Sequence, residues 1–220
     1  MRPLGVLRWL ERRAASSRRM HWLRSLFAIH DIDGLVALDV PWWTYDAIDE
    51  VDAFLAKRPD AKVFEFGSGA SSIWLTKRAE SVISVDHDAD WYPVVKERID
   101  GFAHSQLLLV PRDETAAKDV LYLSQKQGQE GDSFLTYAST IDATDELYDV
   151  IVIDGRARQA CLKHAIAHMA PDGLIVFDNT KRARYREAIA RSNLKVRYLT
   201  GRTPSLPQTD ETALLTRPDP

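Results

Sequence analysis

Short apolar runs alternate with segments of helical periodicity along most of this chain. Runs rich in valine, isoleucine and phenylalanine predict strands at residues 62–66, 81–85, 105–110, 148–154 and 173–178. Apolar positions at helical spacing predict helices at 44–57, 70–79, 89–100, 159–170 and 183–192. This alternation predicts an α/β fold with a doubly wound, mostly parallel sheet whose strands are buried on both faces.

Three parts of the chain depart from this rhythm. Residues 195–200 and 212–217 indicate two final strands, which complete a seven-stranded sheet with an antiparallel C-terminal strand. Residues 113–146 are polar and contain glycine, so we expect an insertion that closes over a ligand. We expect a basic amphipathic helix and an approach helix within residues 1–58, and one main domain at 59–220 with a single core.

The composition is that of an ordinary soluble protein. Of 220 residues, 45% are hydrophobic and 28% charged, and no apolar run is long enough to span a bilayer. Cys161 is the only cysteine, so an internal disulfide is excluded and a reducing, cytoplasmic location is expected.

Positive charge is concentrated at the N-terminus. Only Glu11 opposes the arginines of the first 24 residues, which are Arg2, Arg8, Arg12, Arg13, Arg18, Arg19 and Arg24. Interleaved tryptophan and leucine suit a helix that lies on an anionic membrane or a partner protein. The alternative is a helix with a solvated basic face whose apolar side packs on the domain. Without a basic excess elsewhere, no nucleic-acid partner is expected.

The loop after the first predicted strand, "VFEFGSGASS", carries the most specific signal. Ligands of open α/β sheets bind beyond the carboxyl ends of the strands. A dinucleotide loop needs glycine where Ser72 stands, and Glu65 would repel a pyrophosphate. A cationic ligand without phosphate, such as S-adenosylmethionine, reverses that argument. Asp86, after the second strand, is placed to accept the two ribose hydroxyls of an adenosine cofactor.

Four segments together, "VFEFGSGASSIWL", "VISVDHD", "YDVIVIDG" and "APDGLIVFDN", resemble the class I S-adenosylmethionine-dependent methyltransferase family. The resemblance covers about residues 60–216 and implies a methyltransferase with this cofactor. It implies a methionine-binding loop around Glu65, a ribose contact at Asp86 and an adenine contact at Asp113. The cofactor-binding set that we expect is Glu65, Gly67, Ser68, Gly69, Asp86, His87 and Asp113.

Asp154 and Asp178 end two strands that the topology makes neighbours, so their carboxylates converge. We expect both Asp154 and Asp178 to be catalytic, with Asp154 as our first candidate for the general base and His87 as the second. With Asn179, the two acids resemble the metal set of cation-dependent O-methyltransferases, which makes a divalent cation an alternative. We favour neutralisation by nearby cations, which are Arg156, Arg158, Lys181, Arg182 and Arg184.

The sequence indicates the class of methyl acceptor through a missing motif and through charge. The N-P-P-Y motif of amino-directed DNA methyltransferases is absent after the fourth strand, where "IDGR" stands, which favours an oxygen acceptor. We expect a small-molecule or sugar-type acceptor, and the same cationic cluster would suit an anionic one. Trp42, Trp43 and Tyr45 either roof the acceptor or are packing residues. The rival functions are an NAD-dependent oxidoreductase and a catalytically inactive module that binds a partner or a membrane.

Overall fold

The computed structural model describes residues 4–29 and 31–218, with side chains from residue 9 onward. A seven-stranded sheet with the order β3-β2-β1-β4-β5-β7-β6 crosses the molecule. Among the strands described, β7 alone runs opposite to all the others, so its pairings with β5 and β6 are antiparallel. The strands are β1 Lys62–Phe66, β2 Ser81–Asp86, β3 Ser105–Leu109, β4 Tyr148–Ile153, β5 Met169–Asp178, β6 Lys195–Arg202 and β7 Thr209–Thr216. The predicted fold class is therefore confirmed.

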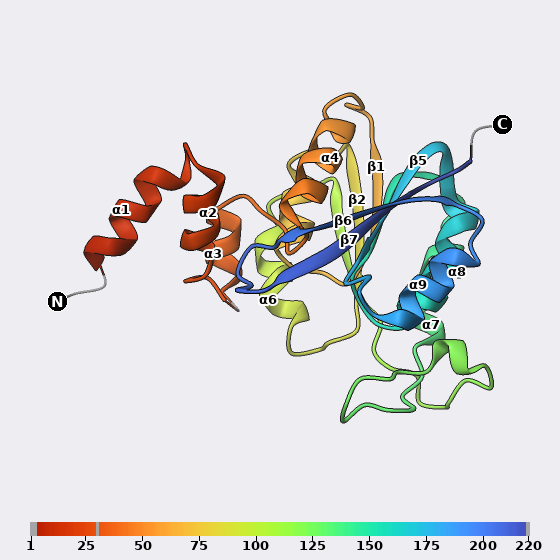
Figure 1. Cartoon of the computed structure of the whole chain (residues 1–220). Helices are drawn as coiled ribbons and strands as arrows, with labels where there is room; N and C mark the ends of the chain where they lie inside the picture. Colours follow the sequence, from red (N-terminus) through yellow and green to blue (C-terminus); the bar gives the residue numbers. More distant parts are fainter. Residues whose placement is uncertain (1–3, 30, 219–220) are drawn as a thin grey trace.

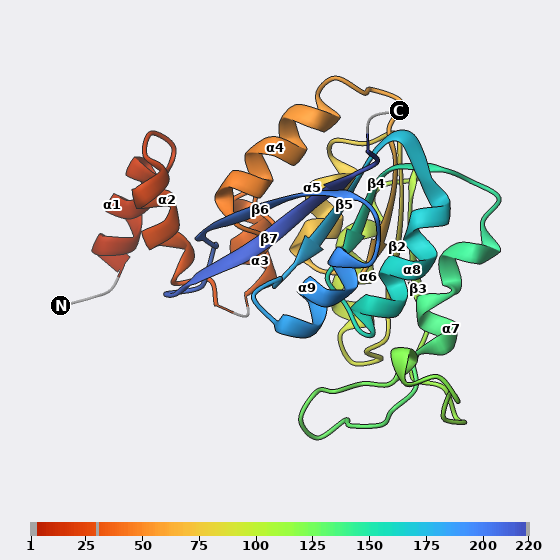
Figure 2. The ribbon, with the colours of Figure 1, turned by 45° about the vertical axis from the view of Figure 1, so that its right-hand side comes forward.

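Helices cover both faces of this sheet (Figures 1 and 2). One apolar cluster joins the sheet to α3, α4, α5 and α6, and the other joins it to α7, α8 and α9. The helices are α1 Leu4–Ala14, α2 Arg18–Ser25, α3 Ile32–Ala37, α4 Tyr45–Leu55, α5 Ala70–Thr76, α6 Tyr92–Ile99, α7 Leu135–Ala138, α8 Arg158–His168 and α9 Ala183–Ala190, with 3-10 turns η1 Val120–Tyr122 and η2 Thr140–Ala143.

Successive side chains along each strand alternate between the two faces of the sheet, so they enter the two helical layers in turn. In β1, Val63 belongs to the cluster under α4 and α5, whereas Phe64 and Phe66 belong to the cluster under α8. Successive strand residues face opposite sides, so Glu65 points into the layer that holds α5. A fully buried carboxylate on an otherwise apolar face needs polar partners, and these partners shape the site described below.

The insertion is buried near its C-terminal end and exposed in its middle. Phe134 and Tyr137 are buried in the cluster under α8, while residues 125–128 are exposed. Figure 1 shows the insertion (green) extending beyond the carboxyl ends of the parallel strands, on the side of α7. The apolar patch within this polar segment is therefore what fixes it to the domain.

The N-terminal segment differs from the single helix that we predicted. It forms α1, α2 and α3, because the chain leaves the helix after Ala14 and after Ser25, and Ser17 and Asp31 then cap the next helices. The Ser17 side chain accepts from the N–H of Met20, and Asp31 accepts from the N–H of Gly34. The predicted boundary between the N-terminal segment and the main domain, at residue 58, stays a prediction.

The start of β5, the end of β6 and the start of β7 were also predicted wrongly. Helix α8 ends at His168 and β5 begins at Met169, so residues 169–172 are strand. A bulge explains this start, because Tyr148 pairs with Met169 while Val150 pairs with Leu174. The final hairpin is longer than predicted, because β6 and β7 pair as far as Arg202 and Thr209.

Candidate active site

A cavity of about 480 Å³ lies where β1, β2, β4 and β5 end. Parallel strands bring their carboxyl ends to one edge, so the loops that follow them surround a common space. The residues that line it are Ile29, Ile32, Leu35, Trp42, Gly67, Ser68, Gly69, Ala70, Ser71, Asp86, His87, Asp88, Trp91, Asp154, Gly155, Arg156, Arg158, Asp178, Asn179, Ser205 and Leu206. Most of the predicted site residues therefore come together.

The glycine turn after β1 depends on a close approach of two backbones. Gly67 has φ +94°, and a Cβ there would lie 2.6 Å from the backbone nitrogen of Gly155 in the loop after β4. The backbone N–H of Gly67 donates to Val85 in β2, and that of Asp154 donates to Phe66 in β1. Only glycine fits this position, since other residues would be strained and would clash.

Asp86 organises the other side of the turn. One carboxylate oxygen accepts from both the N–H and the hydroxyl of Ser68, at 2.8 and 2.7 Å. The other accepts from the N–H groups of His87 and Asp88, at 2.7 and 2.9 Å. Burial favours the neutral acid, but the hydrogen bonds from His87, Asp88 and Ser68 outweigh it, so the pKa of Asp86 lies below its ordinary value. Asp86 is therefore a fixed anion in the cavity wall.

Glu65 does not line this cavity. Its fully buried carboxylate accepts from the hydroxyls of Ser71, Ser72 and Ser84, at 2.5, 2.5 and 2.6 Å. Ser72 also accepts from the N–H of Gly69 at 3.0 Å, so the acid is linked to the glycine turn through a hydroxyl. Burial raises the pKa of Glu65 to about 7, against the three serine hydrogen bonds. Glu65 thus braces the turn from behind, and its predicted contact with a cofactor stays a prediction.

The raised pKa of Glu65 gives stability a specific pH dependence. Above about pH 4.5 the carboxyl group ionises in the unfolded chain, whereas in the folded protein it keeps its proton until about pH 7. The free energy of unfolding of the protein should therefore fall with rising pH, relative to Glu65→Gln, by ~3 kcal/mol across this window. Urea denaturation at several pH values measures the difference. Glu80→Gln, on an exposed residue, is the control, and parallel pH profiles for wild type and Glu65→Gln would contradict the expectation.

Asp154 and Asp178 share a buried network with Arg158. Arg158 pairs with the Asp154 carboxylate at 2.7 Å and donates to the carbonyl oxygens of Asp154, Gly155 and Asp178 at 2.8, 3.0 and 2.7 Å. The Asp178 carboxylate accepts from Thr212 at 2.7 Å. Burial raises the pKa of both acids, and the nearby Asp154 charge raises that of Asp178 further, while Arg158 opposes both effects. The predicted aspartate-arginine pairing is present.

The residues described do not form a cage for a metal. Within residues 4–29 and 31–218, no group of three or more His, Cys, Asp or Glu side chains is placed to hold an ion. Asn179, the third member of the suggested metal set, directs its amide to Asp210 at 2.8 Å. Asp154 is already paired with Arg158, so a cation would have to compete with a guanidinium.

His87 and Asp113 differ in their relation to the cavity. Nε2 of His87 accepts from Nε of Arg156 at 2.9 Å, so the lone pair that a base would use is occupied. Asp113 is absent from the described cavity lining, because its carboxylate accepts from Ser133, Leu135 and Thr136 at 2.6, 2.7 and 3.2 Å. It caps α7, and the adenine contact stays a prediction.

The N-terminal helices contribute a wall that the sequence did not reveal. Ile29, Ile32 and Leu35 line the cavity, and so do Ser205 and Leu206 from the hairpin loop. Hydrogen bonds from Trp22 to Leu206, and between Ser25 and Ser205, tie α2 to that loop. Of the three aromatic residues singled out, Trp42 lines the cavity whereas Trp43 and Tyr45 are buried packing residues.

Some of the N-terminal arginines contact the chain itself. Arg18 pairs with Asp49 at 2.6 Å and Arg24 with Glu11 at 3.3 Å, while the side chains of Arg2 and Arg8 lie outside the described part. None of the helices that the structure describes is both long and apolar enough to cross a bilayer. Membrane or partner contact through this segment stays a prediction.

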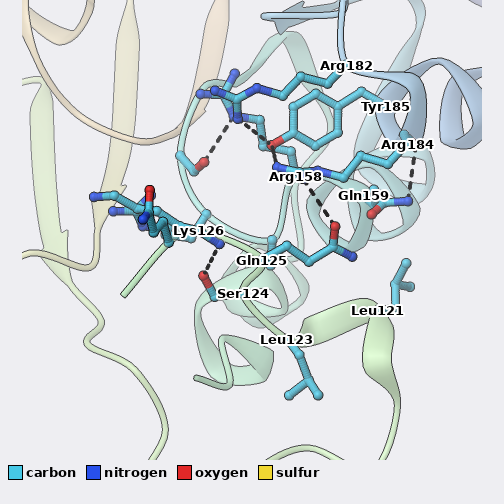
Figure 3. A pocket seen from close by; sticks show the side chains of 14 residues that line it. Leu121, Leu123, Ser124, Gln125, Lys126, Arg158, Gln159, Arg182, Arg184 and Tyr185 are labelled. Carbon is cyan, nitrogen blue, oxygen red and sulfur yellow. Dashed lines mark hydrogen bonds between the residues drawn. The ribbon is translucent and has the colours of Figure 1, made fainter. Parts of the chain in front are cut away.

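A second pocket of about 420 Å³ adjoins the cavity, and the two share Gly155, Arg156 and Arg158. Figure 3 shows its side chains, which come from the insertion, α8 and α9. Its lining is Leu121, Leu123, Ser124, Gln125, Lys126, Gln127, Gly155, Arg156, Ala157, Arg158, Gln159, Arg182, Arg184 and Tyr185. The sequence pointed to the arginines but not to Tyr185 or Lys126, since Tyr185 stood without special notice in a predicted helix and Lys126 stood in a polar loop.

No protein-family model and no curated protein matches this sequence. Solved structures do match the fold. Cofactor-bound Rv0187 from MTB is 16% identical with a TM-score of 0.57, over 87% of this chain and 88% of that one. A TehB-like SAM-dependent methyltransferase from Corynebacterium glutamicum is 15% identical with a TM-score of 0.50, over 89% and 99%. An rRNA methylase from Streptococcus thermophilus is 10% identical with a TM-score of 0.51, over 77% and 95%. The chain therefore has the fold of the class I S-adenosylmethionine-dependent methyltransferases.

Proposed function

We propose that this protein is an S-adenosylmethionine-dependent methyltransferase that methylates an oxygen atom of a small molecule. The observation that carries the proposal is the position of Asp86, held at the tip of β2 beside the Gly67 turn and inside the cavity at the strand ends. An acid there accepts two ribose hydroxyls of an adenosine group. The fold shared with the TehB-like SAM-dependent methyltransferase from Corynebacterium glutamicum supports the same assignment.

The charge of the cavity favours this cofactor over a dinucleotide. Its lining includes four acids, Asp86, Asp88, Asp154 and Asp178, against two arginines, Arg156 and Arg158, of which Arg158 is paired with Asp154. These acids would attract the sulfonium and ammonium groups of S-adenosylmethionine and repel a pyrophosphate. The cavity volume of about 480 Å³ lies within the roughly 300–1,000 Å³ range of small-molecule sites. A fluorescence titration with NADH tests the oxidoreductase rival directly.

The bound cofactor would supply an electrophilic methyl group on a sulfonium. The protein's part is to orient the acceptor in line with that group and to remove the acceptor's proton. A carboxylate oxygen of Asp154 would take the hydroxyl proton of the acceptor as the acceptor oxygen bonds to the methyl carbon and the sulfur keeps the electron pair of the broken bond. Asp154 lines the cavity and retains partial exposure, with 21% of its side chain accessible. Burial raises the pKa of Asp154, which makes its carboxylate a stronger base.

Replacing Asp154 separates binding from chemistry. Asp154→Asn should keep the affinity for S-adenosylhomocysteine within a few-fold but lower turnover by about 100-fold or more, the usual contribution of a general base. Calorimetry measures binding, and transfer of labelled methyl groups to a panel of hydroxylated small molecules measures turnover. An Asp154→Asn enzyme with wild-type turnover would remove Asp154 from the base position.

The same titration, repeated with EDTA, addresses the cation alternative and the inactive-module alternative. Binding of S-adenosylhomocysteine that is unchanged by EDTA supports a cofactor site that needs no metal. A folded protein without affinity for S-adenosylhomocysteine or NADH would overturn the enzyme proposal and favour the module.

A further inference from the structure

We propose that the second pocket, between the insertion and α9, binds a phosphate group of the small-molecule acceptor through Lys126, Arg182 and Arg184. This inference rests on the proposed function, because it assigns the substrate class of the same site. The pocket shares Gly155, Arg156 and Arg158 with the first cavity, so a molecule anchored in one can present a hydroxyl group to the other.

The pocket is cationic without compensating acids. Lys126, Arg156, Arg158, Arg182 and Arg184 line it, and no Asp or Glu belongs to its described lining. The whole chain carries a net charge of −3, so this concentration is local and not a consequence of a basic protein. The planar guanidinium group of arginine can donate two parallel hydrogen bonds to one phosphate. A cluster of cations with no carboxylate partner is typical of anion-binding sites.

The five cations divide into two groups by their present contacts. Arg158 is neutralised by Asp154, and Arg156 donates to His87, so both are committed to the boundary between the pockets. In contrast, none of the ion pairs found among the described residues involves Lys126, Arg182 or Arg184. These three side chains therefore retain their charges for a ligand.

Tyr185 holds the two arginines in place. Figure 3 shows its ring between the side chains of Arg182 and Arg184. Each guanidinium donates to the phenol oxygen at 3.3 Å, and they lie 5.6 and 4.8 Å from the ring centroid. Arg184 also donates to Gln125 of the insertion at 3.1 Å. The pocket therefore has two sides. Arg182, the N-cap of α9, and Arg184 within α9 supply the arginines, and the insertion supplies Gln125 and Lys126.

The surroundings favour a small anion over a nucleic acid. Acids outnumber lysines in the insertion, where Asp113, Glu114, Asp119, Glu130, Asp132, Asp142, Asp145 and Glu146 stand against Lys118 and Lys126. A polyanionic backbone that ran past the pocket would meet these carboxylates, whereas a compact phosphate would not. The volume of about 420 Å³ is sufficient for a phosphorylated small molecule.

Titration with inorganic phosphate, at constant ionic strength and with saturating S-adenosylhomocysteine, tests this site. Wild type should show saturable binding that is weakened about tenfold in Lys126→Gln and in Arg184→Gln, and further in the double variant. Acetate should bind at least about tenfold more weakly than phosphate, because phosphate carries about −1.5 charges at neutral pH, against one for acetate, and has more acceptor oxygens. Arg191→Gln, on the exposed residue that follows α9, is the matched control and should bind phosphate as wild type does.

Equal phosphate affinity in wild type and the double variant would overturn the proposal, and so would acetate binding as tight as phosphate binding. A short single-stranded RNA that binds more tightly than phosphate, and does so equally in the double variant, would assign the acceptor to nucleic acid instead. The proposed methyltransferase function and the proposed phosphate site can be contradicted separately. Loss of S-adenosylhomocysteine binding contradicts the methyltransferase, whereas intact S-adenosylhomocysteine binding without phosphate binding contradicts only this pocket.

Discussion

Replacing Asp86 with alanine is expected to lower the affinity for S-adenosylhomocysteine by at least about 100-fold, because two hydrogen bonds to a charged acceptor are lost. The variant also releases the N–H and hydroxyl of Ser68, which the carboxylate holds at 2.8 and 2.7 Å. The loss of the ribose hydrogen bonds and the loss of the Ser68 hydrogen bonds affect the same wall of the cavity. Calorimetric titration measures the affinity, and thermal denaturation of the free protein shows whether the fold is kept.

Two further variants make this test selective. Asp86→Asn preserves the shape of the side chain but replaces one acceptor oxygen with a donor, so it should also bind poorly. Asp90→Asn makes the same chemical change on an exposed residue of the same connection, outside the cavity lining, and should bind as wild type does. A folded Asp86→Asn protein with undiminished affinity would show that the adenosine group lies elsewhere.

Replacing Arg158 with methionine should destabilise the protein by about 3–5 kcal/mol, the usual cost of leaving one member of a buried ion pair alone. Arg158 is only 8% exposed, and its removal leaves the Asp154 carboxylate and three carbonyl oxygens without their donor. Urea denaturation measures the change. The deficit should shrink as the pH falls, because protonation of Asp154 removes the unpaired charge.

A double-variant cycle identifies the cause of this loss. If the unpaired charge dominates, Asp154→Asn combined with Arg158→Met should recover part of the stability that Arg158→Met loses. Arg191→Met, on an exposed arginine, should change the free energy of unfolding by less than about 0.5 kcal/mol. A stability of Arg158→Met within about 1 kcal/mol of wild type would mean that the network does little to hold the site together.

The layered fold could be predicted because its signals are local. Strand β1 begins and ends where the apolar run does, and the glycine turn follows it directly. The parallel arrangement then places Asp86, Asp154 and Asp178 at one edge whatever the details of packing, and the structure has all three in one cavity lining. The N-terminal segment was harder to predict, because its apolar spacing continues across Ser17 and Asp31, where capping hydrogen bonds start new helices.

The roles of individual side chains were decided by contacts between distant segments. Glu65 was placed beside a ligand by its position in the loop motif, yet its partners include Ser84 of a neighbouring strand, and it lies behind the turn. Asp113 follows a strand end as Asp86 does, but the start of α7 takes up its carboxylate. Which of two similar acids faces the cavity depends on what packs against it, and local sequence does not contain that information.

By itself, then, the sequence determined the sheet, the glycine turn and the acids at the strand ends, because side-chain periodicity and backbone freedom act over a few neighbouring residues. Only the tertiary structure decided that Arg158 neutralises Asp154, that α3 and the hairpin loop wall the cavity, and that Lys126 of the insertion lines the same pocket as Arg184 of α9. Those contacts join segments far apart in the chain. They form only when strand order and loop conformation bring the segments together, and burial then fixes which charges are paired.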